Sequence, residues 1–287
     1  MSKVFAFITV YNPEEPVKGN VAEISKQVDF AFVCDNSSKC NLDIFNNLKN
    51  IKYCWYGKNN GLSIAFNLAI KENLHDFCDD DYLIFFDQDS SVEFGHVKEL
   101  VDEFEYLIKK GIKIGCLGPA FFNVNSGLVE IPRIKTKIEE KLYNVQSIIT
   151  SSMLCKFSVL RSVGYWNDLI FLDFADWDLC WRFKKNGYAC ILTERKILKH
   201  RLGVGERKVG PVHIRIGASI REYYQTRDAC YLIRCDYVPM NMRIRLLLNL
   251  TVRPFVHMLF LSDKKKRLFY IFRGFRDAIN KIKGEFK

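Results

Sequence analysis

The sequence has no uninterrupted apolar run of 18 residues, no CxxC pair, no internal repeat and no low-complexity segment. Its longest apolar candidate, residues 246–261, is interrupted by Asn249, Arg253, Pro254 and His257, so we predict no membrane-spanning helix. The first residues lead directly into a short strand-like run, which is not the pattern of a secretory signal. We therefore expect the ten cysteines to be free thiols in a reducing cytosol, and a structural zinc site is disfavoured.

Basic residues are in excess, but the excess is confined to one end of the chain. The sequence has 43 Lys and Arg against 33 Asp and Glu, and residues 243–287 alone contain twelve basic and three acidic residues. The remaining chain is nearly neutral, which does not suit the basic groove of a nucleic-acid binder. With 48% hydrophobic and 26% charged residues, 287 residues indicate one large globular domain with an appendage.

Strands and helices alternate over the first 120 residues. Helical stretches are expected up to about residue 28, at 61–71 and at 97–110, and apolar runs of β-forming residues lie at 4–10, 30–34, 51–56, 82–86 and 114–122. Continuous apolar strands separated by helices predict an α/β fold, with a mostly parallel sheet covered by helices on both faces. Ligands of such sheets bind at the carboxyl ends of the strands.

The alternation becomes irregular after residue 122. We predict a hairpin at 123–133, a strand at 147–154, a loop and helix at 171–188, and a short strand at 190–192 with Lys199-His200 after a turn. From residue 264 the chain is a basic amphipathic helix, because six apolar residues share one face: Leu268, Ile271, Phe272, Phe275, Ile279 and Ile282. We therefore divide the chain into an α/β domain, 1–230, and a basic helical region, 231–287.

The sharpest chemical signal is Asp87-Gln88-Asp89, directly after the apolar run at 82–86. Two carboxylates at positions i and i+2 of a strand exit can together hold a hard divalent cation such as Mg²⁺ or Mn²⁺. A turn in which each aspartate caps local backbone groups explains the same pattern. The preceding strand and the other acidic clusters favour the metal.

A second acidic cluster contains Asp173, Asp176 and Asp178 beside Trp177. Asp176 is expected in the first turn of the helix that ends at Gly187. Acidic side chains are stabilised there by the helix dipole, which is one explanation. The other is a general base beside a hydrophobic wall, where burial raises the basicity of the carboxylate.

Three weaker signals complete the set. His200 would complete a metal site with two carboxylates, although an isolated histidine is more often structural. The segments 35–38 and 60–61 are turn sequences, and both can also recognise a base or ribose at the end of a strand. We find no Ser-His-Asp or Cys-His set in a convincing context.

In their order, these motifs resemble those of the family 2 glycosyltransferases with a GT-A (Rossmann-like) fold, and among them the bacterial rhamnosyltransferase-like branch. The resemblance covers residues 3–230. The motifs are TVYN (9–12), VCDNSS (33–38), NNGLSIAFN (59–67), FFDQDS (85–90), ITSSML (149–154), FLDFADWDLCWR (171–182), NGY (186–188), HRLG (200–203) and REYYQTRD (221–228).

The resemblance implies a role for each site residue. It makes Asp176 the catalytic base, and it makes Asp89, Asp87 and His200 the ligands of Mn²⁺ or Mg²⁺, with Asp89 the most direct. The nucleotide-sugar is implied to lie against Thr9, Tyr11, Asn12, Asp35, Asn60, Gly61, Asp87 and Asp89. Support of the acceptor loop, or contact with the acceptor, is implied for Ser152, Trp177, Asp178 and Arg182.

Two positions depart from the family pattern. Many relatives carry Glu-Asp where this chain has Ala175-Asp176, so Asp178 or Asp173 would have to supply any second carboxylate. Many relatives also have Ser-Gly where this chain has 150–152, and Ser152 would then narrow the acceptor side of the cleft.

The resemblance implies an inverting, metal-dependent transfer of a sugar, L-rhamnose from dTDP-L-rhamnose as the first choice. UDP-galactofuranose or another UDP-sugar is the rival donor. The acceptor is expected to be a lipid-linked glycan at the inner face of the cytoplasmic membrane, where the basic tail can bind anionic lipid. The same tail can instead pack on the α/β domain or on a second copy of the chain.

Two other classes of protein fit the sequence less well. An inactive scaffold subunit of a membrane assembly would not need Asp87, Asp89, Asp176 and His200. A metal-dependent nucleotidyltransferase would be expected to have a Gly-rich basic loop near the first strand, and residues 9–16 do not provide one.

Overall fold

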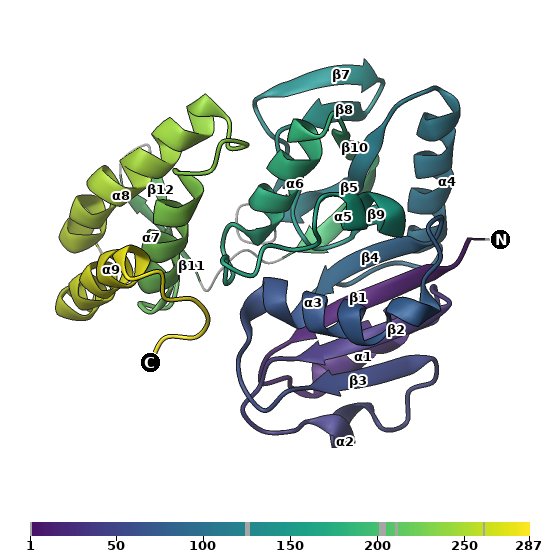
Figure 1. Ribbon diagram of the computed structural model, residues 1–287, viewed down its shortest axis with the longest axis horizontal. Coiled ribbons are helices and arrows are strands. Elements are labelled where there is room, and N and C mark those ends of the chain that lie inside the picture. Colours follow the sequence, from purple (N-terminus) through teal and green to yellow (C-terminus); the bar gives the residue numbers. More distant parts are fainter. Residues whose placement is uncertain (1, 124–126, 201–204, 210–211, 261) are drawn as a thin grey trace.

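The computed structural model describes residues 2–123, 127–200, 205–209, 212–260 and 262–287, without the side chains of 123, 199–200, 205–209 and 212–216. A ten-stranded sheet runs through the molecule, with a group of helices beside it (Figure 1). The strand order is β3 (Ile51–Trp55), β2 (Phe30–Asp35), β1 (Val4–Val10), β4 (Tyr82–Asp87), β9 (Met153–Lys156), β5 (Ile114–Asn123), β10 (Ala189–His200), β8 (Leu142–Val145) and β7 (Lys135–Glu139), with β6 (Leu128–Glu130) on β5.

The sheet is parallel from β3 to β4, as the alternation of strands and helices predicted, and β5 is parallel to β10. The other half is mixed, because β9 lies antiparallel between β4 and β5, and β8 pairs antiparallel with β10. The carboxyl ends of β1, β2 and β4 share one edge, since Val10 pairs with Asp35 and Thr9 with Asp87.

Helices cover both faces of the sheet, as predicted. Alternate residues of a strand point to opposite faces. Phe5 and Phe7 of β1 pack in one core with α3 (Gly61–Glu72), α5 (Phe157–Ser162) and α6 (Ala175–Lys185). Ala6 and Ile8 pack on the other face with α1 (Glu15–Ser25) and α4 (His96–Lys109). The short helix α2 (Leu42–Phe45) and a 3₁₀ turn, η1 (Leu74–Asp76), complete this part of the chain.

The second half of the sheet corrects one expectation. We predicted a short strand at 190–192 and a turn before Lys199-His200, but β10 continues to His200 beside β5. The pairing shifts between Thr193 and Ile197, so a bulge accommodates the polar residues that suggested a turn. The predicted hairpin at 123–133 is present as β5 and β6, and its residues 124–126 lie outside the described residues.

The helices α7 (Arg221–Leu232), α8 (Met240–Phe260) and α9 (Lys264–Ile279) pack against one another beside the sheet, at the left of Figure 1. A two-stranded ribbon, β11 (Gly205–Val209) and β12 (Val212–Ile216), precedes them. The predicted division at residue 230 falls inside α7. Pro254 lies within α8, and none of the helices in the described residues is long and apolar enough to cross a membrane.

The face of α9 that is buried differs from the predicted one. Ile271 is buried, but Phe272 and Ile279 are 68% and 72% exposed, and Gly274 lies against α7 instead. A Cβ on Gly274 would stand 2.8 Å from the carbonyl oxygen of Tyr223, so the two helices approach closely only because this residue is glycine.

One residue of the basic run at 264–267 points inward. Arg267 is 3% exposed, and its Nη1 donates to Glu222 Oε1 at 2.9 Å. The same oxygen lies 2.7 Å from Nδ1 of His257. Arg253 Nη2 lies 3.8 Å from the other oxygen, Glu222 Oε2. Three cationic or hydrogen-bonding partners thus compensate the buried carboxylate, and only the lysines of the run remain exposed.

Candidate functional site

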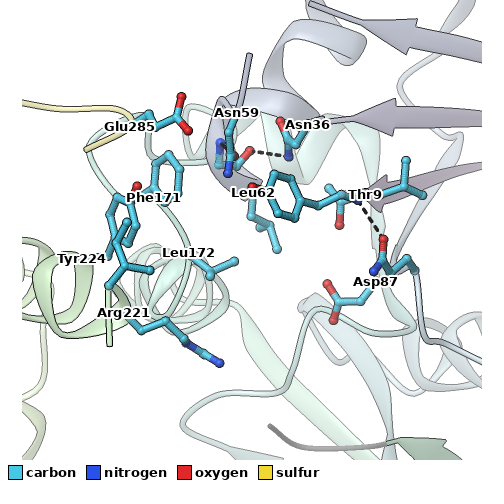
Figure 2. Close-up of a pocket in the computed structure, with 15 residues that line it drawn as sticks. Thr9, Asn36, Asn59, Leu62, Asp87, Phe171, Leu172, Arg221, Tyr224 and Glu285 are labelled. Atoms are coloured by element: carbon cyan, nitrogen blue, oxygen red, sulfur yellow. Dashed lines mark hydrogen bonds between the residues drawn. The ribbon is translucent and has the colours of Figure 1, made fainter. Parts of the chain in front are cut away.

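A cavity of about 330 Å³ opens at the carboxyl ends of β1 and β4 (Figure 2). Four residues of the predicted nucleotide site, Thr9, Tyr11, Gly61 and Asp87, lie together in it. Its walls come from both strand ends, the start of α3, the loop before α6, the start of α7 and the C-terminal segment: Thr9, Val10, Tyr11, Asn36, Asn59, Gly61, Leu62, Asp87, Gln88, Phe171, Leu172, Ile220, Arg221, Tyr224 and Glu285.

The end of β1 is fastened to its two neighbouring strands. The backbone N–H of Tyr11 donates to Gln88 Oε1 at 2.8 Å, and that of Asn12 donates to Ser37 Oγ at 2.7 Å. Asn12 has a φ of +44°, a conformation that asparagine tolerates better than most residues. The side chain of Tyr11 is left 50% exposed beside the cavity, where it can contact a bound ligand.

Asp35, at the end of β2, lies beside the cavity and is only 1% exposed. Its Oδ1 accepts the backbone N–H of Ser37 at 2.7 Å, and its Oδ2 accepts the side chains of Asn41, at 2.9 Å, and Tyr53. Donors therefore surround both oxygens. Contact of Asp35 with a base or ribose, which the resemblance implied, stays a prediction.

The start of α3 is built from asparagine side chains. Asn36 Nδ2 donates to the carbonyl of Gly61 at 3.1 Å, and Asn36 Oδ1 accepts the N–H of Asn60 at 3.2 Å. Asn59 Oδ1 accepts the N–H of Gly61 at 3.0 Å. Gly61 has a φ of +73°, and a Cβ there would lie 2.4 Å from the carbonyl oxygen of Phe171. Asn60 is thus buried behind the wall, and Asn36 and Asn59 face the cavity instead.

The two aspartates after β4 differ in their surroundings. Asp87 is partly buried, and its Oδ2 accepts a hydrogen bond of 2.6 Å from Ser151 Oγ. Asp89 is exposed and lies outside the cavity walls. Ser151, from the segment before β9, was not among our predicted site residues. Its contact with Asp87 spans 64 residues of sequence, so only the antiparallel pairing of β4 and β9 reveals it.

Ser152, the next residue, is fully buried, and its Oγ lies 2.6 Å from Nε2 of His96. Burial lowers the pKa of His96 to about 4, so the imidazole is neutral at pH 7. Ser152 does not line the cavity, and its place at the acceptor side of the cleft stays a prediction.

The buried imidazole predicts a loss of stability in acid. The unfolded chain protonates histidine with a pKa of about 6.5, so between pH 6.5 and pH 4 the unfolded state binds more protons than the folded state. We expect this residue to lower the free energy of unfolding by about 3 kcal/mol as the pH falls through that range. Urea denaturation of the wild type and His96→Gln at pH 7, 5.5 and 4 measures this change in the free energy of unfolding. An equal pH dependence in both proteins would contradict the assignment.

Asp176 lies in the first turn of α6, as predicted, and its side chain is partly exposed. Its Oδ1 accepts the N–H of Trp177 at 2.8 Å. Although the residue is partly exposed, the surrounding protein desolvates its carboxyl group, and this raises the pKa of Asp176 well above its ordinary value. Cys180, Asp87 and Asp173 raise the pKa further. The negative charge of Asp87 therefore acts on the Asp176 carboxylate, which has the raised basicity that a general base needs.

Asp178 and Arg182 support the loop before α6. Asp178 is completely buried, and its Oδ1 accepts hydrogen bonds from Asn167 at 2.9 Å and from Tyr237 OH at 2.6 Å. Its Oδ2 accepts Arg182 Nε at 2.8 Å. Arg182 Nη1 donates to two backbone carbonyls in residues 163–165. Between the two predicted roles, the geometry favours loop support over contact with an acceptor.

One arginine of α7 and one of α8 reach α6 and the loop before it. Arg245 of α8 stacks on the ring of Trp177, with its Cζ 5.0 Å from the ring centre. Arg221 of α7 forms an ion pair with Asp173 and also lines the cavity. Arg221 belongs to the predicted α/β domain, 1–230, whereas Arg245 belongs to the predicted helical region, 231–287, so both parts of the chain contact this loop and helix.

The remaining metal-site prediction concerns His200. Its backbone pairs with Asn123 at the end of β10, and its side chain lies outside the described residues. All ten cysteines are free thiols. The Sγ atoms of three of them, Cys116, Cys180 and Cys190, lie within 4.8 Å of one another in the core. This thiol cluster is separate from the cavity walls.

Comparison with known proteins identifies the family. The model for glycosyl transferase family 2 matches residues 5–164, more than half of the chain. The chain belongs to glycosyltransferase family 2. This glycosyltransferase is 26% identical over 296 residues to dTDP-rhamnosyl transferase RfbF of Shigella flexneri, and the match covers 99% of the chain and 96% of RfbF. The predicted resemblance to bacterial rhamnosyltransferases is thereby confirmed.

The chain is also similar to a second, more distant relative and to two solved structures. The low-salt glycan biosynthesis hexosyltransferase Agl10 of Haloferax volcanii is 25% identical over 193 residues, which are 62% of this chain and 60% of Agl10. TarS of S. aureus, fragment 1–349, has a TM-score of 0.56 at 14% identity, over 96% of this chain and 81% of that one. GalNAc-T7, solved with UDP, GalNAc and Mn²⁺, has a TM-score of 0.57 at 13% identity, over 98% and 57%. These likenesses confirm the GT-A fold.

Proposed function

We infer that this glycosyltransferase transfers L-rhamnose from dTDP-L-rhamnose to a lipid-linked glycan, with inversion at the anomeric carbon and with a divalent cation. The observation that carries the donor is the similarity to a dTDP-rhamnosyl transferase over nearly the whole of both chains. A cavity of about 330 Å³ at the carboxyl ends of parallel strands provides a place for the nucleoside.

The acidic residues suit a hard cation. Asp87 and Asp89 offer carboxylate oxygens at one strand exit, and the pKa of Asp176 is raised in part by the negative charge of Asp87 and Asp173. Mg²⁺ or Mn²⁺ prefers such oxygen ligands, and a bound cation would relieve that repulsion. We assign the ion to Asp87 and Asp89, with His200 as the third ligand. When bound, the cation stabilises the negative charge that develops on the departing nucleoside diphosphate.

Asp176 is assigned as the base. The acceptor hydroxyl oxygen forms a bond to the anomeric carbon, the bond from that carbon to the diphosphate oxygen breaks, and the hydroxyl proton passes to the Asp176 carboxylate. One displacement without a covalent intermediate inverts the anomeric centre. Asp178 and Arg182 hold the loop before α6 in place, so that Asp176 keeps its position at the start of that helix.

The anomeric outcome tests this mechanism without knowledge of the acceptor. Water can replace the acceptor in a slow hydrolysis, so we expect ¹H NMR of dTDP-L-rhamnose with enzyme and Mn²⁺ to show first the free sugar of inverted configuration. Release of the sugar with the configuration of the donor would contradict a single displacement. The variant Asp176→Asn serves as the control for hydrolysis that does not come from the site.

A surface of α8 and α9 suits an acceptor held in a membrane. Exposed apolar side chains lie on α8 at spacings of one helical face, and α8 contains no acidic residue. Lys264, Lys265 and Lys266 are exposed at the start of α9. Apolar groups flanked by basic ones bind an anionic bilayer, and a second copy with the same positive charge would be repelled. The exposed apolar residues of α8 include Ile244, Leu247, Leu248, Val252, Phe255 and Leu259.

We therefore place the protein peripherally at the inner face of the cytoplasmic membrane. The double variant Phe255→Glu, Leu259→Glu should bind vesicles of phosphatidylglycerol at least about 10-fold more weakly than the wild type, because each change removes apolar contact and adds repulsion. Phe94→Glu is the matched control, since Phe94 is 98% exposed elsewhere on the chain. Sedimentation with vesicles measures binding. Equal binding by all three proteins would show that this surface does not bind the membrane.

A further inference from the structure

A tight turn precedes β9 and lies beside the end of β4. The N–H of Met153 donates to the carbonyl oxygen of Thr150 at 2.9 Å and closes the turn, and the N–H of Ser152 donates to the carbonyl oxygen of Phe85 at 2.7 Å. Met153 then pairs with Phe85 at the start of β9. The turn is thus fastened to β4, and its second residue, Ser151, is completely buried.

The third residue of this turn, Ser152, has a backbone conformation that serine rarely adopts. Its φ is +70°, in the left-handed region where glycine is usual. A side-chain contact compensates, because Ser152 Oγ lies 2.6 Å from Nε2 of His96 and both residues are buried. Backbone strain persists only where the surrounding structure holds it, and it is concentrated at functional sites. The turn is therefore held in a costly shape, and what that shape achieves is the position of Ser151.

The hydroxyl of Ser151 lies on the carboxylate of Asp87, with its Oγ donating to Oδ2 at 2.6 Å. The backbone of Asp87 is held as well, because its N–H donates to Ser90 Oγ at 3.2 Å and its carbonyl oxygen accepts the N–H of Ser90 at 3.0 Å. An ionised carboxylate has about four acceptor positions on its two oxygens, so one hydroxyl sets its orientation without filling it. Asp87 lines the cavity and is thus oriented before a ligand binds (Figure 2).

We propose that Ser151 is a positioning residue for the divalent cation: its hydroxyl orients the Asp87 carboxylate, and the contact between Ser152 and His96 keeps the turn that presents this hydroxyl. The proposal rests on the proposed function, in which Asp87 and Asp89 hold Mn²⁺ or Mg²⁺, and it deepens that function by naming what prepares one of the ligands. Carboxylates that bind a metal are themselves hydrogen-bonded, and these outer partners fix their orientation. Ser151 does not line the cavity, so it acts through Asp87.

The test measures the affinity for Mn²⁺ itself, by electron paramagnetic resonance of the free ion in the presence of dTDP. Ser151→Ala should raise the Kd for Mn²⁺ about 10-fold to 100-fold, the usual effect of removing a hydrogen-bond partner from a metal ligand. The affinity for thymidine, which has no phosphate to meet the cation, should stay unchanged in an NMR titration. Ser63→Ala is the matched control and should bind Mn²⁺ as the wild type does. Ser63 is equally buried, and its Oγ has no hydrogen-bond partner among the described residues.

Each other outcome overturns the proposal in a distinct way. If Ser151→Ala binds Mn²⁺ as tightly as the wild type, the hydroxyl does not position Asp87, and the proposed function stands. If the variant loses affinity for Mn²⁺ and thymidine to the same extent, Ser151 supports the whole site and not the cation. If the folded wild type binds no Mn²⁺, the proposed cation fails together with the positioning role. Circular dichroism and thermal melting confirm folding of each variant, and Ser151→Cys repeats the test with a side chain of similar shape whose S–H is a weak donor.

Discussion

Asp176→Asn should lower the rate of sugar transfer by about 10²-fold to 10⁴-fold, the usual contribution of a positioned general base. Asparagine keeps the shape of the side chain and can still accept the N–H of Trp177 at the start of α6, but it cannot take a proton. Because Asp176 does not line the cavity assigned to the nucleotide, the affinity for dTDP should change by less than about twofold. A transfer assay with donor binding measured in parallel separates the two effects.

The pH dependence gives a second readout of the same residue. Burial raises the pKa of Asp176, so the wild-type rate should fall as the pH decreases through that raised value, where the base becomes protonated. Asp102→Asn, an exposed aspartate on α4, is the matched control and should leave both the rate and its pH profile unchanged. A normal transfer rate in Asp176→Asn would mean that another group takes the proton, and Asp173 would be examined next.

Asp89→Ala should abolish the stimulation of turnover by Mn²⁺ or Mg²⁺, with a loss of about 10³-fold at saturating metal. The magnitude follows from the several kcal/mol by which a cation stabilises a departing diphosphate. Asp89 is exposed, so its removal should not lower the free energy of unfolding by more than about 0.5 kcal/mol. Turnover with and without metal, for the wild type, Asp89→Ala and the control Asp102→Asn, measures the effect.

Asp87→Ala is a less clean experiment, because Ser151 Oγ would lose its acceptor in a partly buried place. Full metal-stimulated turnover in Asp89→Ala would refute its role as a ligand. Loss of activity without loss of metal stimulation would mean that Asp89 acts on the sugar or ribose and not through the cation.

Local patterns predicted the part of the fold that forms the strand ends of the cavity. Residues 4–10 are apolar except for Thr9 and are followed by Tyr11-Asn12-Pro13, so the strand and its end are both visible in the sequence. The same holds for residues 82–86 with Asp87 and Asp89. Parallel neighbours then bring these ends together, because every strand of a parallel sheet ends at the same edge.

Contacts between distant segments could not be predicted in this way. Arg267 belongs to a basic run in the sequence, yet it is buried because Glu222, 45 residues earlier, provides its partner. The α8 sequence contains Asn249, Arg253 and Pro254, which argue against a long helix, but it folds as one because it packs on α7 and α9. No local pattern marks Glu285 as a cavity residue, since its position depends on where the chain after α9 returns.

The central claim is that the cavity binds dTDP-L-rhamnose with a divalent cation, and calorimetric titration of nucleotide-sugars tests it most directly. The panel contains dTDP-L-rhamnose, UDP-galactofuranose, UDP-galactose, UDP-glucose and GDP-mannose, each with and without Mn²⁺. We predict metal-dependent binding of dTDP-L-rhamnose that is at least about 10-fold tighter than that of the other donors. Preference for a UDP-sugar would overturn the donor assignment, and no binding of any donor by the folded, metal-loaded protein would contradict the account as a whole.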